Sequence, residues 1–300
     1  MQPVSTLNID KHAIIPRLDA DTCGESPFWS QVEQAWYWSD IPAGRIQRWH
    51  PASDHFDRWQ LPEQTGCVVQ REDGRLLIAG ESGLFTLDTT SGNFNRILDV
   101  QFPTSGMRFN DGKCDRAGRL WVTSFMMASD KRPIGSLFRF DERGLVECIA
   151  GGFMTPNGMA FSPDNRTLYI SDSHADVRKV WAIDYDLASG SLGERRLFID
   201  MHDFAGRPDG ASIDAEGGYW VAGMDAGCIY RFTPSGQLDR IVELPVRHPT
   251  MPVFGGAAMD EVFVTSLKRG NIPVEQDPHA GKVLCFQLGN RGIAEVPFRG

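Results

Sequence analysis

Residues 119–124 read RLWVTS, a short run of aromatic, β-branched and small residues that recurs five more times along the chain. The related segments are AWYWSD (35–40), RLLIAG (75–80), TLYISD (167–172), GYWVAG (218–223) and EVFVTS (261–266). They follow one another at intervals of about 40 to 50 residues, as repeated structural units do. Because aromatic and β-branched residues favour strands, the repeat predicts six copies of one β-rich unit.

Each copy is surrounded by further strand and turn signals. Five of the six segments follow a turn-forming sequence, namely EDG, RAG, PDN, AEG or AMD. A second strand-like run comes after each segment, as in SLFRF (136–140) and KVWAI (179–183), and most units continue into a looser outer run. Units of this size with four strands are typical of propeller blades. The sequence therefore predicts an all-β, six-bladed β-propeller of four-stranded antiparallel blades.

One ring of blades uses the whole chain, so we expect a single domain over residues 1–300. A solenoid would also repeat, but it would need polar capping units, whereas a ring closes its own sheet edges. Ring closure often borrows a strand from the opposite terminus, and HAIIPRL (12–18) is the candidate to complete the last blade. Residues 1–11 are expected to form a loose N-terminal tail.

Composition limits the kinds of partner. The formal net charge of -9 argues against a surface for nucleic acid or anionic membranes. The sequence has no run of about 18 apolar residues, so we expect no transmembrane helix. The first residues lack the basic flank and apolar core of a secretory signal, and the 6 cysteines form no C-x-x-C pair. We expect a cytoplasmic protein with reduced thiols, either a monomer or a weak homodimer, that binds a small molecule.

Polar residues precede the repeated segments in four of the six units. If the repeated segment is the innermost strand of its blade, the residues just before it lie at the mouth of the central channel. The oxygen-bearing side chains found there are Glu25, Asn110 or Asp111, Asn157 and Asp209. Such oxygens converging on one axis would suit Ca²⁺, Mg²⁺ or Mn²⁺ and leave open positions for catalysis. Asn-Gly and Asp-Gly are also common turn sequences, and Asp111 with Gly112 suits such a turn.

The motifs CGESPFW (23–29), RFNDGKCDRAGRLW (108–121), TPNGMAFSPDNRTLYISDS (155–173) and RPDGASIDAEGGYWVA (207–222) occur in this order. Together they resemble the senescence marker protein / gluconolactonase family, which includes regucalcin and bacterial sugar-acid lactonases. The likeness extends over nearly the whole chain. It implies a six-bladed propeller that opens a sugar lactone with one divalent cation, which could be Ca, Zn, Mg, Mn or Fe(II).

The resemblance also implies roles for individual residues. Glu25, Asn157 and Asp209 correspond to the metal ligands, and Asp209 also corresponds to the general base. Arg108 and Asn110 correspond to substrate-binding residues. In this scheme the cation polarises the lactone carbonyl, water attacks it, and Asp209 takes the proton.

Residues 124–132 depart from the family pattern. Relatives often have a small-residue stretch there, followed by an acid that contacts the substrate. This chain instead has Phe125 followed by two methionines, and its next acid, Asp130, comes later. The departure predicts either a more apolar pocket wall or a substrate with a different or anionic substituent. Lys131 and Arg132 could help to bind an anionic substituent. The alternative is a solvated hairpin tip.

Other residues are weaker candidates. His174 follows one repeated segment and could contact substrate, while His248 and His279 lie in proline-containing loops. The tryptophans are expected in the blade cores: Trp36, Trp38, Trp121 and Trp220. Two alternative functions stay open: hydrolysis of an organophosphate or another ester, and non-catalytic calcium binding.

Overall fold

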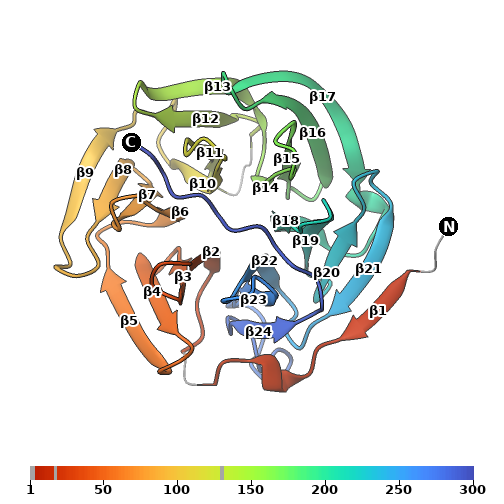
Figure 1. The fold of residues 1–300 in the computed structure, drawn as a ribbon. Helices are drawn as coiled ribbons and strands as arrows, with labels where there is room; N and C mark the ends of the chain where they lie inside the picture. Colours follow the sequence, from red (N-terminus) through yellow and green to blue (C-terminus); the bar gives the residue numbers. More distant parts are fainter. Residues whose placement is uncertain (1–3, 17–18, 129–131) are drawn as a thin grey trace.

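Six β-sheets stand around a central channel as the blades of a propeller (Figure 1). The structure is a computed structural model that describes residues 4–16, 19–128 and 132–300. Blade 1 contains β2 (Gly24–Ser30), β3 (Ala35–Asp40), β4 (Arg45–His50) and β5 (His55–Gln60). Blade 2 contains β6 (Thr65–Gln70), β7 (Leu76–Gly80), β8 (Gly83–Leu87) and β9 (Phe94–Asp99). Blade 3 contains β10 (Met107–Cys114), β11 (Leu120–Met126), β12 (Gly135–Asp141) and β13 (Gly144–Phe153).

The second half of the chain builds the remaining blades in the same order. Blade 4 contains β14 (Pro156–Phe161), β15 (Thr167–Asp172), β16 (Lys179–Asp186) and β17 (Ser191–Asp200). Blade 5 contains β18 (Arg207–Ile213), β19 (Tyr219–Met224), β20 (Cys228–Phe232) and β21 (Leu238–Glu243). Blade 6 contains β22 (Pro249–Gly255), β23 (Glu261–Ser266) and β24 (Leu284–Gln287). Consecutive strands of a blade pair antiparallel, which confirms the predicted propeller.

The innermost strands are not the aromatic segments of the repeat. Figure 1 shows that β2, β6, β10, β14, β18 and β22 line the channel, and these are the stretches that we expected to be loops. The repeated segments are the second strands, so this part of the sequence interpretation was wrong. The innermost strands lack an aromatic and β-branched pattern because they pack too closely. A Cβ atom at Gly66 of β6 would lie 2.2 Å from the carbonyl oxygen of Phe109 on β10.

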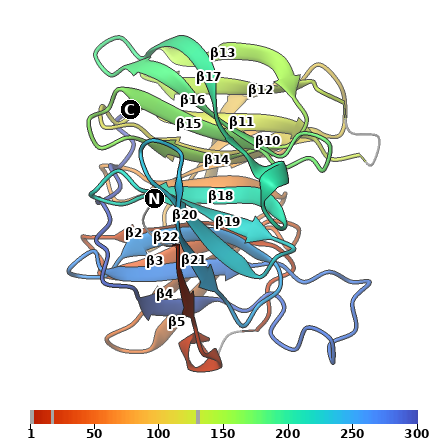
Figure 2. The same cartoon turned by 90° about the vertical axis from the view of Figure 1, so that its right-hand side faces the viewer.

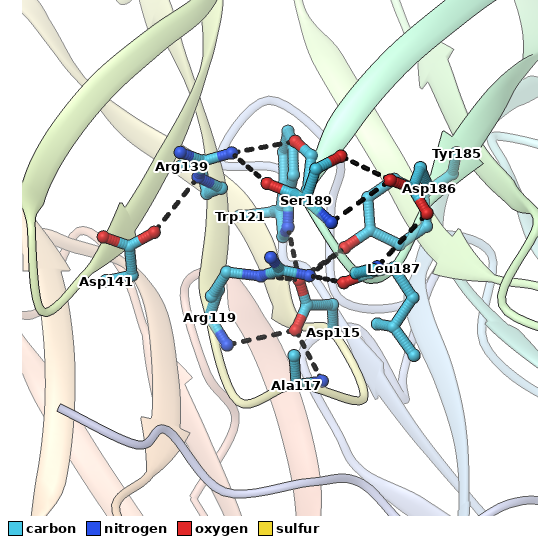
Figure 3. A network of polar contacts seen from close by, with 12 residues as sticks. Asp115, Ala117, Arg119, Trp121, Arg139, Asp141, Tyr185, Asp186, Leu187 and Ser189 are labelled. Carbon is cyan, nitrogen blue, oxygen red and sulfur yellow. Dashed lines mark hydrogen bonds and ion pairs between the residues drawn. The ribbon is translucent and has the colours of Figure 1, made fainter.

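The second strands carry the large side chains of the core. Trp36, Trp38, Trp121 and Trp220 are fully buried, as predicted. A buried aspartate in the preceding turn anchors some of these rings. Asp115 accepts hydrogen bonds from the Trp121 Nε1 at 3.0 Å, the Arg119 Nε at 2.7 Å and the Tyr185 hydroxyl at 2.5 Å (Figure 3).

The same arrangement recurs in blade 5. Asp214 accepts from the Trp220 Nε1 and from the Arg231 Nε, both at 2.8 Å. The repeat is therefore stabilised by buried, fully paired carboxylates as well as by apolar packing.

The N-terminal residues are more ordered than predicted. β1 (Ser5–Asn8), expected in a loose tail, pairs in parallel with β21 at the outer edge of blade 5. A short 3-10 helix, η1 (Lys11–Ala13), follows, and a second one, η2 (Met201–Asp203), lies after β17. Within 12–18, Ile14 forms an isolated antiparallel bridge to Leu284 on β24, the position of a fourth strand in blade 6. Residues 17 and 18 lie outside the described part of the chain.

The C-terminal segment, residues 288–300, crosses one mouth of the channel and is called the strap here (Figure 1). Figure 2 shows the C-terminal end on one side of the ring and the loop 267–281 on the opposite side. The strap contacts blades on both sides of the channel. Its bridges join Gly292 to Asp214 in blade 5 and Phe298 to Arg71 in blade 2, and Glu295 forms an ion pair with Lys113 of β10 at 2.6 Å.

Two further observations concern the sequence predictions. All 6 cysteines are free thiols, in agreement with the expected reduced state. Within the described residues, the structure has no helix with the length and apolar character to cross a membrane.

We predict that Phe298→Ala destabilises the protein by about 3–5 kcal/mol, as usual for removal of a buried aromatic ring. Phe298 is 1% exposed and stacks on Phe140, with the two ring centroids 5.2 Å apart. Urea unfolding measures the change, with Val32→Ala as a control because Val32 is 88% exposed. Equal stability of the two variants would show that the strap does not hold the ring together.

Candidate functional site

A β-bulge interrupts each innermost strand near the channel mouth opposite the strap. The pairing register shifts between Glu25 and Phe28 in β2, Asn157 and Ala160 in β14, and Pro208 and Ala211 in β18. β10 has the same shift between Phe109 and Gly112. A bulge adds a residue to one strand and re-aims the side chains beside it. The six-fold repeat of the fold therefore presents polar side chains at one level of the channel.

Two bulges contain residues in the left-handed backbone region. Ser26 has φ 52° and Gly158 has φ 63°, each one residue after a candidate site residue. The strained Ser26 is held by the next blade, because its hydroxyl accepts a hydrogen bond from the Val68 N–H at 2.9 Å. This contact also fixes the backbone that carries Glu25.

Glu25 and Asp209 are buried carboxylates that lack a cationic hydrogen-bond partner among the described residues. Burial raises the pKa of Glu25 well above its usual range, and the charges of Asp209 and Asp111 add to the effect. Burial also raises the pKa of Asp209 strongly, opposed mainly by the charge of Arg207. The two carboxylates therefore lie close enough to repel each other in a site where water cannot stabilise their charges.

Asp111 has a different environment. Its Oδ2 accepts a hydrogen bond from the Met159 N–H of β14 at 2.8 Å, so it ties blade 3 to blade 4. Burial raises its pKa to about 6. The expected turn at Asp111 and Gly112 does not exist, because β10 continues to Cys114. The polar residues around Asp111 instead form a β-bulge within β10. Bulges and turns use similar residue types, so the sequence alone did not distinguish them.

A chain of hydrogen bonds runs from blade 3 to blade 5 across the site. Arg108 donates from Nη1 to the Asn110 Oδ1 at 2.9 Å, and Asn110 donates from Nδ2 to the Asn157 Oδ1 at 2.9 Å. Asn157 donates from Nδ2 to the Ser173 hydroxyl at 2.8 Å, and Ser173 donates to the Pro208 carbonyl at 2.5 Å. The amide of Asn157 is thus oriented from both sides, and its oxygen keeps a second lone pair for another ligand.

Arg108 is buried in the channel wall and lies over the ring of Phe125, with its Cζ 4.6 Å from the ring centroid. The two residues are directly paired across β10 and β11. Burial lowers the pKa of Arg108 to about 10, so the guanidinium remains charged at neutral pH. Its Nε is buried without a hydrogen-bond partner in the described part of the chain, and its Nη2 makes no hydrogen bond there either.

The structure thus places all five predicted site residues on the innermost strands of blades 1, 3, 4 and 5. These residues are Glu25, Arg108, Asn110, Asn157 and Asp209. Phe125 is part of a buried strand rather than a hairpin tip. Asp130 and Lys131 lie outside the described residues, and Arg132 is exposed.

The sequence interpretation missed Ser173, which links Asn157 to blade 5. Its position directly after the second strand of blade 4 is the signal that could have identified it. Of the weaker histidine candidates, His174 is partly buried beside Ser173 on the same face, and His248 is buried beside Asp225.

The available donors suit a hard cation better than a soft one. Among the described residues, no group of three or more His, Cys, Asp or Glu side chains is arranged to hold a metal ion. The candidate donors are instead two carboxylates and one amide oxygen, a mixed oxygen set that hard divalent cations accept. Glu25 and Asp209 have no cationic hydrogen-bond partner among the described residues, so their carboxylates could balance the charge of a bound cation.

A sequence model described as "SMP-30/Gluconolactonase/LRE-like region" matches residues 23–268. The chain belongs to this family. A relative named 6-deoxy-6-sulfogluconolactonase from Pseudomonas putida is 37% identical over 283 residues, which cover 92% of this chain and 95% of that protein. L-arabinolactonase from Azospirillum brasilense is 30% identical, and the match covers 93% of this chain and 93% of that protein. Regucalcin from Sus scrofa is 32% identical, with 93% of this chain and 95% of that protein covered.

Solved structures of similar shape confirm the family fold. A calcium-binding protein, regucalcin, from Agrobacterium tumefaciens has a TM-score of 0.92 at 24% identity and covers 99% of this chain and 100% of its own. At that identity the likeness shows the fold alone. A luciferin-regenerating enzyme has a TM-score of 0.87 at 25% identity, with 95% of this chain and 98% of its own covered.

We predict that Glu25→Gln and Asp209→Asn each stabilise the protein when a chelator is present at pH 8. Each change removes one of two buried, repelling charges while nearly preserving shape. Urea unfolding in the chelator should give higher midpoints for both variants than for the parent.

Asp115→Asn is the matched control, because Asp115 is buried but paired with Arg119. It should lose about 3 kcal/mol, the usual result of breaking a buried ion pair. If the Glu25 and Asp209 variants were destabilised to a similar extent, the two carboxylates would not carry an uncompensated charge.

Proposed function

We propose that this protein is a lactonase that hydrolyses the cyclic ester of a sugar acid. The observation that carries the proposal is that two buried carboxylates, Glu25 and Asp209, lack a cationic hydrogen-bond partner among the described residues and lie near the guanidinium of Arg108. Relatives that match over nearly their whole length are named as lactonases of sugar acids. A lactone is an uncharged ester whose carbonyl oxygen becomes negative on attack, so a site of this kind needs a positive charge at that oxygen.

We further propose that Glu25, Asn157 and Asp209 hold one divalent cation. The two carboxylates would supply the charge that balances it, and the amide oxygen of Asn157 is already oriented by Asn110 and Ser173. When bound, the cation would polarise the lactone carbonyl and favour the attack of water. Several divalent ions accept this donor set, and Ca, Zn, Mg, Mn and Fe(II) are the ones to test.

Asp209 is the proposed general base. Its carboxylate receives no hydrogen bond from the described residues, so it has lone pairs available for a proton from the attacking water. A cation beside Asp209 would lower its proton affinity. Its role as a base therefore depends on its position next to the water rather than on unusual basicity.

Arg108 and Asn110 are the proposed substrate-binding pair. The Arg108 Nη2, which makes no hydrogen bond within the described residues, can donate to the developing oxyanion or to a sugar hydroxyl, and Phe125 keeps the guanidinium plane in place. The side-chain amide of Asn110 already makes hydrogen bonds within the protein. Its Oδ1 accepts from Arg108, and its Nδ2 donates to the Pro156 carbonyl and to Asn157. Its contribution to substrate binding is therefore the remaining lone pair of its oxygen together with the orientation of Asn157.

A non-catalytic calcium-binding role is the second candidate, since relatives named regucalcin match the chain. The pair of Arg108 and Asn110 beside the carboxylates favours catalysis, because storage of an ion does not require a buried arginine next to it. One chain supplies every proposed site residue, so a monomer suffices for activity. The 6 free cysteines fit a reducing compartment such as the cytoplasm.

We predict that Asp209→Ala lowers the rate of sugar-lactone opening by about 10²–10⁴-fold, the usual contribution of a general base. Chelation of the parent should abolish activity, and a divalent cation should restore it. The assay measures acid release from gluconolactone and a pentonolactone after correction for spontaneous hydrolysis. Full activity in the chelator, or an unchanged rate in the variant, would contradict the mechanism.

Binding of the cation can be tested without turnover. A divalent cation at 100 times its dissociation constant should stabilise the parent by about 2.7 kcal/mol and raise its melting temperature. Glu25→Gln and Asp209→Asn should lose most of this increase. Glu142→Gln is the control, because Glu142 is exposed in the turn between β12 and β13, the outer strands of blade 3. An equal increase in all four proteins would place the cation elsewhere.

A further inference from the structure

A second cluster of charged residues lies on the site face of blades 5 and 6. Arg207 begins β18, two residues before Asp209, and Asp225 directly follows β19. Arg269 lies in the loop after β23. The charges of Arg207, Asp225 and Arg269 all influence the pKa of Asp209. The cluster therefore borders the candidate active site on the side away from Arg108.

Asp225 holds the two arginines side by side. Its Oδ2 accepts from the Arg207 Nε at 2.8 Å, and its Oδ1 accepts from the Arg269 Nη2 at 2.8 Å. Asp225 has φ 72° in the turn between β19 and β20, a left-handed conformation that aspartate adopts more readily than most residues.

The arginines keep donors that the protein does not use. Arg207 makes one further contact, a 3.3 Å hydrogen bond from Nη1 to the Ser173 carbonyl. Within the described residues, the Arg207 Nη2 and the Arg269 Nε and Nη1 have no hydrogen-bond partner. The side chains of Arg207 and Arg269 are 25% and 35% exposed, so these donors can reach a ligand at the channel mouth.

The local charge also favours an anion. His248 is buried below the pair, with its Nδ1 3.1 Å from the Asp225 Oδ1, and burial lowers its pKa so that it is neutral at pH 7. Asp277 lies on the other side of His248, with its Oδ2 4.0 Å from Nε2. At the channel mouth, Arg207 and Arg269 share the single carboxylate of Asp225, so these three side chains carry one net positive charge.

We propose that Arg207 and Arg269 form an anion-binding subsite for a charged terminal group of the lactone substrate. A sulfonate, phosphate or carboxylate at the end of the sugar chain would accept hydrogen bonds from both guanidinium groups while the ring carbonyl lies between Arg108 and Asp209. The inference rests on the proposed lactonase function. A cation on Glu25 and Asp209 would be neutralised by those two carboxylates, so it would not replace the arginines as the partner of a distant anion.

The test compares gluconolactone with three analogues that carry a sulfonate, a phosphate or a carboxylate at carbon 6. The parent enzyme with a divalent cation should prefer at least one charged lactone over gluconolactone by tenfold or more in kcat/KM. Arg269→Gln should reduce this preference by about tenfold or more, mainly through KM, and Arg269→Lys should retain part of it. The ranking of the three analogues identifies which anion the subsite accepts.

Arg247→Gln is the matched control, because Arg247 is a nearby exposed arginine that makes no hydrogen bond to Asp225 within the described residues. It should keep the preference of the parent. A parent that prefers none of the charged lactones, or an Arg269→Gln variant that keeps the full preference, would overturn the subsite.

Failure of the proposed function has a different signature, since neither charged nor neutral lactone would then be hydrolysed. Calorimetric binding of the open-chain products, gluconate and its 6-sulfonate, tests the subsite in that case. The sulfonate should bind the parent at least tenfold more tightly than gluconate, and Arg269→Gln should remove the difference. Equal binding of both products to the parent would also overturn the subsite.

Discussion

The close approach of six innermost strands around one axis is the constraint on which the rest of this structure depends. Where β6 meets β10, even a Cβ atom at Gly66 would collide with the neighbouring backbone. Strands packed so closely leave little room for large side chains at the channel axis. Short hydrogen bonds join them instead, as between Ser26 and Val68, Asp111 and Met159, and Thr250 and the Gly24 carbonyl. The polarity of the channel is thus required by the geometry of the ring before any chemistry is considered.

The same constraint explains how the candidate site is pre-organised. The bulges turn side chains toward the channel, and the hydrogen bonds between blades then fix their orientation. Asn157 illustrates this: its amide is held by Asn110 from blade 3 and by Ser173 from its own blade, and Ser173 is bonded to blade 5. Few rotamers are left to be lost when a ligand binds, which lowers the cost of binding. Glu25 and Asp209 differ because no comparable contact satisfies them, and this contrast distinguishes candidate ligands from structural carboxylates such as Asp115.

The sequence predicts the second strands well and the innermost strands poorly, for a physical reason. Segments such as RLWVTS fill the space between blades with aromatic and β-branched side chains, so they have a clear strand pattern. The innermost strands contain glycine, proline and polar residues, which resemble loops. Glu25, Asn110, Asn157 and Asp209 could nevertheless be proposed from the sequence, because bulges and turns share their residue types, whereas Arg108 was proposed only from the family resemblance. Their roles stay predictions. The strap and the pairing of Arg269 with Asp225 could not be predicted, since they join positions far apart in the chain through single contacts.

The contact between Phe125 and Arg108 changes the interpretation of residues 124–132, where the sequence departs from the family pattern. Phe125 is paired with Arg108 across β10 and β11, and its ring supports the guanidinium of the arginine that we propose binds the substrate. Apolar support of this kind provides no partner for a charged substituent. The unused donors of Arg207 and Arg269 lie on the opposite side of the site and do provide one. If the proposed subsite is correct, a substrate held at Arg108 would meet its second positive region across the channel, beyond Asp209. Specificity for the terminal group would then depend on Arg269 in the loop after β23, outside the closely packed innermost strands.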